Sequence, residues 1–152
     1  MPGIDATLNL EPQGSDVLYD MQIGPDGDVL TEDSLETAIL ASCFTDRRAE
    51  PEQAPIARMR RGWVGDLETP GDPFGSLLWL LDQSRVTATV AAQAVDFVER
   101  ALEWMVQDGI AIAIHADAEI DTTTVRLIVD LDRPNSRSDR FLVMLWDNTG
   151  RP

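Results

Sequence analysis

Few side chains in this sequence are suited to covalent or metal chemistry. Cys43 is the only cysteine and His115 the only histidine in 152 residues, whereas zinc sites use three or four such ligands. A nucleophilic serine or cysteine needs a histidine or similar base beside it, and His115 lies in an alternating segment typical of a strand. The glycines match neither dinucleotide-binding nor P-loop spacing. We therefore expect no catalytic residue, no cofactor and no metal.

Carboxylates are the remaining candidates for catalysis. Acids number 27 against 12 bases, so a pair suitable for glycoside hydrolysis arises easily by chance. Glu68 and Asp72 are the best such pair because both lie in the loop after Trp63. A hydrolase that uses them is one alternative, although nothing in the sequence demands it.

The excess of acidic residues restricts the class of partner. The net charge is −15, and the sequence contains arginine but no lysine. Nucleic-acid binding depends on basic side chains that displace counterions from phosphates, so we expect no nucleic-acid partner. No apolar run approaches the roughly 20 residues that span a bilayer, and the N-terminus lacks the basic and apolar parts of an export signal. We expect a protein made in the cytoplasm that does not bind membranes.

One loop combines the residue types that concentrate binding energy at interfaces. Arg60, Arg61 and Trp63 lie close together and are followed by Asp66. Tryptophan and arginine are enriched among the residues that dominate interfaces, so we predict that these four residues contact a partner. The alternative is that Arg61 pairs with Asp66 and holds the turn.

Hydrophobic periodicity predicts the elements that position these residues. A capping box at Asp33 and Glu36 and an Asp72-Pro73 pair indicate helix starts. The expected strands cover residues 16–23, 110–120, 124–132 and 141–146, and the expected helices cover residues 33–47, 74–81 and 87–107.

The order of these elements predicts the fold class. We expect a single α+β domain over residues 1–152, with a mostly antiparallel sheet and about three helices packed on one face. Residues 1–15 are expected to be flexible and residues 49–62 to form an irregular loop. In the segment 74–81, Trp79 is expected in the core, and Cys43 is expected to be a buried, inert thiol.

Six short motifs follow one another along residues 16–146. They are Gly27-Asp28, Asp46-Arg47-Arg48-Ala49, Arg61-Gly62-Trp63, Gly75-Ser76-Leu77-Leu78-Trp79-Leu80-Leu81, Ala101-Leu102-Glu103-Trp104 and Asp108-Gly109. In this order and spacing they resemble the Mu-like prophage baseplate wedge family, whose members are related to the sheath-initiator subunits of contractile tails. Two positions depart from the family pattern: Val64 replaces a second tryptophan, and Asp82-Gln83-Ser84-Arg85 replaces a more basic stretch.

The resemblance implies a non-enzymatic structural component of a contractile phage, or phage-derived, tail baseplate. Such a protein would act in wedge assembly and in the initiation of sheath polymerisation. Its partners would be other baseplate wedge proteins, the tail sheath and, as a further candidate, the tail tube. Its location would be the virion tail baseplate. The alternatives are a tail-associated peptidoglycan hydrolase and a small cytoplasmic adaptor or binding module.

The last apolar segment is a second candidate contact. Residues 141–146 are apolar on both faces. The resemblance implies a sheet edge presented to the first sheath subunits, and an added strand would satisfy the unpaired backbone groups of such an edge. Phe141, Val143 and Leu145 are the candidate contact residues. A central strand buried between two layers is the alternative.

Overall fold

The structure is a computed structural model that describes residues 5–6, 8–13, 16–21, 31–32, 35–82, 84–122 and 124–147, with only the backbone described before residue 33 and for residues 144–147. The chain divides into two compact units, residues 1–41 and residues 42–152. The Gly27-Asp28 motif and the predicted helix cap at Asp33 lie outside the described residues. The organisation as a single domain stays a prediction.

The first unit contains short antiparallel strand pairs and the beginning of a helix. β2 (Leu8–Gln13) pairs with β3 (Asp16–Met21), and β1 (Asp5–Ala6) pairs with β4 (Thr31–Glu32). β3 confirms the strand predicted from residue 16, while β1 and β2 lie in the segment predicted to be flexible. α1 (Glu36–Phe44) begins in this unit and ends in the second.

α1 ends earlier than the predicted end at Arg47 because the next residues form other hydrogen bonds. Arg47 N donates to Ser76 O, and Ser76 N donates to Thr45 O, each at 2.9 Å. A parallel bridge joins Asp46 to Ser76. The backbone groups of residues 45–47 are therefore committed to residue 76 and cannot extend the helix.

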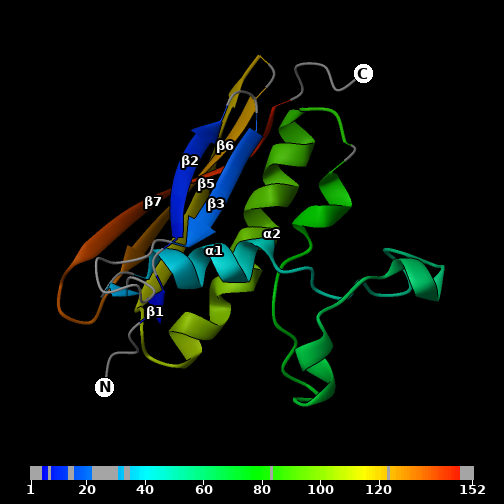
Figure 1. Cartoon of the computed structure of the whole chain (residues 1–152), viewed down its shortest axis with the longest axis horizontal. Helices are drawn as coiled ribbons and strands as arrows, with labels where there is room; N and C mark the ends of the chain where they lie inside the picture. The colour runs from blue at the N-terminus through cyan, green and yellow to red at the C-terminus, as the bar shows by residue number, and fades with distance from the viewer. Residues whose placement is uncertain are drawn as a thin grey trace. The chain divides into compact units, whose positions relative to one another are not determined.

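The second unit is built on a three-stranded antiparallel sheet. β5 (Ala113–Asp121), β6 (Thr124–Asp132) and β7 (Ser138–Asp147) lie in the order β5-β6-β7. The inward side chains of β6 are fully buried: they are Val125, Leu127, Val129 and Leu131. Alternation at period two thus predicted the central strand correctly. In Figure 1, β7 (orange) lies at one edge of this sheet.

α2 (Ala88–Gln107) packs against β5 (Figure 1). Its first turn is capped by Thr87, whose hydroxyl accepts a hydrogen bond from Val90 N at 3.2 Å, as expected of an N-cap threonine. Gly109 follows the helix with a φ of 74°, a left-handed conformation that favours glycine. Its buried stripe repeats every three or four residues: Ala91, Ala94, Val98, Ala101, Leu102 and Met105. The predicted helix is confirmed.

The third predicted helix, at residues 74–81, is wrong. Only a single 3₁₀ turn, η3 (Leu78–Leu81), forms there, so the described residues contain two α-helices rather than about three. Gly75 has a φ of 102°, and Ser76 is bonded to residues 45–47. A helix cannot therefore start at Asp72-Pro73. The loop at residues 49–62 is irregular as predicted, apart from the 3₁₀ turn η1 (Ala57–Met59).

Candidate functional site

Residues 50–72, here called the arm, run out from the sheet and α2 of the second unit before the chain returns to η3 (Figure 1). At its base Ala49 N donates to Arg60 O at 2.9 Å. The Arg60 side chain then holds the first half of the arm, donating from Nε to Ala54 O (2.7 Å) and from Nη2 to Pro55 O (3.0 Å). Arg60 is therefore a structural residue of the arm.

Arg61 fastens the arm to three residues outside it. Its Nη1 lies 3.0 Å from Asp46 Oδ2 and 3.7 Å from Asp82 Oδ2. Its guanidinium lies over Trp79, 4.7 Å from the ring centre. The predicted alternative, in which Arg61 pairs with Asp66, is wrong, because Arg61 pairs with Asp46 and Asp82 instead.

The carboxyl of Asp82 is affected by this cluster. Burial raises the pKa of Asp82, the positive charge of Arg61 opposes that rise, and the negative charge of Asp46 adds to it. Both carboxylates thus depend on the single guanidinium that they share, which makes Arg61 the centre of the cluster.

Asp66 has a different role from the one predicted as an alternative. Its Oδ1 accepts a hydrogen bond from Phe74 N at 3.0 Å, and its own N–H donates to Trp63 O at 3.2 Å. Asp66 therefore ties the turn after Trp63 to Phe74, just beyond the end of the arm. Trp63 lies above this turn with its ring 5.6 Å from the Phe74 ring, at an interplanar angle of 59°, a tilted arrangement that is favourable for aromatic pairs.

The two glycines around Trp63 are required by close contacts. Gly62 has a φ of 118°, and a Cβ there would lie 3.0 Å from Arg48 Cβ. A Cβ on Gly65 would lie 2.2 Å from the Trp63 ring. The Arg-Gly-Trp-x-Gly-Asp spacing is thus explained by a tryptophan folded back over its own turn.

The arm carries a concentration of exposed apolar side chains. Trp63 is 47% exposed, Val64 75% and Leu67 79%, and Ile56 and Met59 are also exposed. These five account for half of the ten large exposed apolar residues in the described part of the chain, although the arm is short. Exposed apolar patches can mark interaction surfaces, so the arm is a candidate contact. Of these five residues, only Trp63 was predicted from the sequence as a contact. The other four could have been found only as apolar residues in a segment without periodicity.

η3 is held on the segment after α1. The Trp79 Nε1 donates to Arg47 O at 2.8 Å, and the Ser76 hydroxyl donates to Cys43 O and accepts from Leu78 N. Trp79 is half-buried, in agreement with a structural role. Cys43 is buried, as predicted, and burial raises the pKa of its thiol to about 12.

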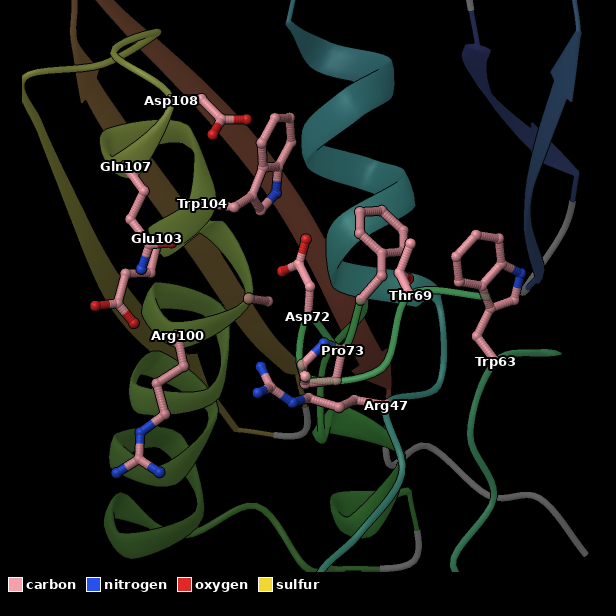
Figure 2. Close-up of a pocket in the computed structure, with 13 residues that line it drawn as sticks. Arg47, Trp63, Thr69, Asp72, Pro73, Arg100, Glu103, Trp104, Gln107 and Asp108 are labelled. Atoms are coloured by element: carbon pink, nitrogen blue, oxygen red, sulfur yellow. The ribbon is translucent and has the colours of Figure 1, made fainter. Parts of the chain in front are cut away.

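A cleft of about 530 Å³ lies between the second half of α2 and the arm, and is here called the α2 cleft. Figure 2 shows Glu103, Trp104 and Asp108 on the α2 wall, with Asp72 and Trp63 coming from the arm. The indole N–H of Trp104 is already used, because it donates to the Ser42 hydroxyl at 3.0 Å. Trp104 is half-buried, and its side chain forms part of the cleft wall.

Carboxylates cover part of the β5 edge of the sheet. Ala116 N donates to Glu99 Oε1 at 3.0 Å, and Ala118 N donates to Asp117 Oδ1 at 2.8 Å. These backbone donors therefore point away from β6. A strand that paired with β5 would have to displace both carboxylates.

The same alternation shows which backbone groups of β7 face outward. Consecutive donors in a strand point to opposite sides, so Asp117 N faces β6, where residue 117 is opposite Ile128. Leu127 is opposite Val143 on the other side. It follows that Val143 N faces β6 and Leu142 N faces away from the sheet. Among the described residues no hydrogen bond reaches Leu142 N.

The predicted contact residues of β7 differ in exposure, because alternate side chains of a strand point to opposite faces of the sheet. Val143 is 1% exposed and belongs to the core, Phe141 is half-buried, and the side chain of Leu145 lies outside the described residues. Leu142, which was not singled out, is 57% exposed. A partner strand would meet the backbone of β7 and the Leu142 side chain. β7 is an edge strand of the described sheet, and the alternative of a central strand does not hold there.

A bidentate ion pair fastens β7 to β6 next to this edge. Arg140 Nε lies 2.7 Å from Asp130 Oδ1, and Arg140 Nη2 lies 3.0 Å from Asp130 Oδ2. The hydrogen bond from Arg140 lowers the pKa of the Asp130 carboxyl. The pair fixes the strand register on the solvent face.

The carboxylates and the histidine considered for enzymatic chemistry lie at the surface. Glu68 and Asp72 are exposed, and the His115 side chain is exposed on β5. Within the described residues no three His, Cys, Asp or Glu side chains are grouped as metal ligands. The same residues include no helix that is both long and apolar enough to span a membrane.

The fold and the motifs can now be compared with known proteins. The family described as "Phage protein GP46" matches residues 35–138, and the chain belongs to this family. It is 43% identical over 100 residues to "Baseplate protein gp46" of Escherichia phage Mu, covering 64% of this chain and 68% of that protein. It is also 34% identical over 109 residues to "Mu-like prophage FluMu protein gp46" of Haemophilus influenzae, covering 72% of this chain and 74% of that protein. The predicted relationship to Mu-like baseplate proteins is confirmed.

Proposed function

We propose that this protein is a non-enzymatic structural component of a contractile phage, or phage-derived, tail baseplate. It acts there in wedge assembly and in the initiation of sheath polymerisation. Membership of the family and the name of the phage Mu relative support the baseplate assignment. The observation that carries the proposal is the arm, because it exposes apolar side chains on a braced loop instead of burying them.

Wedge assembly is assigned to the arm. Full burial of a large apolar side chain contributes about 1.5–3 kcal/mol. A partner that covered the exposed parts of Trp63, Val64 and Leu67 would gain part of this free energy from each of them. Arg60 and Arg61 hold the arm in one conformation. A braced loop loses less conformational freedom on binding than a mobile one. Arg60, Arg61 and Asp66 therefore support the contact mainly by shaping the arm, while Trp63 makes it.

Sheath initiation is assigned to the β7 edge. A strand of a sheath subunit added there would pair with the outward groups of residues such as Leu142, since main-chain hydrogen bonds supply affinity in strand addition. The opposite edge is guarded by Glu99 and Asp117. The sheet therefore accepts a strand on one side, as directional assembly requires.

The remaining properties fit a protein partner. A net charge of −15 disfavours nucleic acid and keeps subunits apart until a complementary surface arrives. We place the protein in the virion tail baseplate after synthesis in the host cytoplasm. Its partners are other wedge proteins and the tail sheath, with the tail tube as a further candidate.

Complementation of a phage or prophage that lacks this gene tests the proposal. Wild-type protein should restore complete tails, whereas Trp63→Ala with Leu67→Ser should leave tails without assembled baseplates in electron micrographs. Ile112→Ser is the matched control, because Ile112 is 62% exposed but lies outside the arm. Full assembly with the arm variant would refute the assignment of the arm. Cleavage of peptidoglycan by the purified protein, lost in Glu68→Gln, would refute the non-enzymatic role.

A further inference from the structure

We propose that the α2 cleft binds an arginine side chain presented by a neighbouring baseplate protein. The inference rests on the proposed function for the kind of partner, but the cleft can be tested without any tail assembly. Its volume of about 530 Å³ lies within the range of about 300–1,000 Å³ of small-ligand pockets. One inserted side chain and its flanking backbone would fit there.

The walls of the cleft combine aromatic rings with carboxylates. Trp63 and Trp104 contribute rings, and Asp72, Glu103 and Asp108 contribute acids. Within the described part of the chain no hydrogen bond or ion pair occupies these three carboxylates. An arginine guanidinium both stacks on aromatic faces and pairs with carboxylates, so it matches both kinds of wall.

The end of α2 adds a second electrostatic reason. A helix carries a partial negative charge at its C-terminus, where cations are favourable. The last turn of α2 contains no basic residue, while Glu103 and Asp108 place negative charge near it. A cation from another protein would therefore be favoured near the end of this helix.

The basic residues that line the cleft lie toward its other end. Figure 2 shows Arg47 and Arg100 apart from Asp108 and Gln107. Arg100 is already paired with Asp96, with its Nε 3.1 Å from the Asp96 Oδ2. The acidic end near Trp104 is thus the part suited to an incoming cation.

The molecule contains one instance of the same recognition. The Arg61 guanidinium lies 4.7 Å from the Trp79 ring centre and 3.0 Å from Asp46 Oδ2. Indole and carboxylate together therefore hold a guanidinium at the base of the arm. The α2 cleft combines the same two groups, and within the described residues neither Arg47 nor Arg100 forms an ion pair with its carboxylates.

The test is a titration of the whole ¹⁵N-labelled protein with the peptide acetyl-Gly-Arg-Gly-amide, followed by NMR. We expect saturable shifts of the Trp63 and Trp104 indole signals, with a dissociation constant on the order of 1 mM for so small a probe. The citrulline peptide, which has the same shape without the charge, should give no saturable shift. Equal shifts with both peptides, or none with either, would overturn the proposal.

Charge variants locate the binding site. Glu103→Gln should weaken binding about threefold, as expected for one half-exposed ion pair, and Glu103→Gln with Asp108→Asn by about tenfold. Glu119→Gln is the matched control, because it removes one exposed negative charge from β5, outside the cleft. An equal loss in Glu119→Gln would show that only net charge matters and would overturn the proposal. If these variants lose peptide binding but still form normal tails, the cleft binds arginine but the proposed assembly role is wrong.

Discussion

The guanidinium of Arg61 lies 4.7 Å from the centre of the Trp79 ring, and this contact joins the arm to η3. Arg61 adopts a φ of 50° to reach it, a conformation that costs a non-glycine residue about 1 kcal/mol or more. Its ion pair with Asp46 and the stacking on Trp79 offset that cost. The arm is therefore positioned by contacts between residues that are distant in the sequence.

Replacing Arg61 should loosen the arm without unfolding the protein. Both partners of the Asp46 pair are nearly half exposed, so the pair contributes about 0.2–1 kcal/mol and the stacking a similar amount. Thermal melts should show Arg61→Ala less stable by about 1 kcal/mol. Arg61→Lys keeps the charge, so its stability should lie between that of the wild type and that of Arg61→Ala. A loss as large as that of a core truncation would contradict this account.

Two glycines with positive φ should respond very differently to alanine. Gly75 has a φ of 102°, and a Cβ there would lie 2.4 Å from Thr45 O. Gly71 has a φ of 93° with open space around it. Gly71→Ala should cost about 1 kcal/mol from the backbone conformation alone. Gly75→Ala should cost about 3 kcal/mol or more, because the clash adds to that strain. Equal costs in denaturant titrations would show that the bridge at Ser76 is not rigid.

Proline substitutions in β7 separate the edge from the core. Leu142→Pro removes a donor that faces away from β6, so the protein should fold and enter baseplates but fail to start the sheath. Val143→Pro removes a donor that faces β6 and disturbs a buried side chain, so it should cost about 3 kcal/mol or more. Melting curves and micrographs of tails would distinguish the two. Normal sheaths with a folded Leu142→Pro would exclude strand addition at this edge.

The thiol of Cys43 should be unreactive until the protein unfolds. Its pKa of about 12 leaves on the order of a thousandfold less thiolate at pH 8 than an unperturbed cysteine has. Iodoacetamide should therefore label Cys43 readily only in denaturant. Rapid labelling of the folded protein would show that α1, which carries Cys43, opens locally.

The same shift predicts how stability depends on alkaline pH. Between pH of about 8.5 and 12 the unfolded chain has released the Cys43 proton and the folded protein has kept it. Folding is then destabilised as pH rises, by at most about 1.4 kcal/mol per unit. The difference in stability between wild type and Cys43→Ala should change with pH in this direction. A constant difference would contradict the burial of the thiol.

Elements with a strong period were predicted correctly from the sequence. The alternation along residues 124–132 identified β6, and the spacing of three and four residues along 87–107 identified α2. Both patterns indicate directly which side chains are buried in the core.

Segments that depend on distant partners were not predicted correctly. Residues 74–81 have the composition of a helix, but Ser76 is bonded to residues 45–47. The same bonds end α1 before Arg47. Because local propensity contributes only fractions of a kcal/mol per residue, such tertiary hydrogen bonds outweigh it.

The order of residues was enough to place the chain among Mu-like baseplate proteins, because motif identity is a property of the chain alone. It could not show that Arg61 would pair with Asp46 instead of Asp66, or that Leu142 would face outward while Val143 was buried. Those outcomes depend on strand register and on contacts between residues far apart in the chain. They exist only after the backbone has folded, and they determine which surfaces a partner can reach.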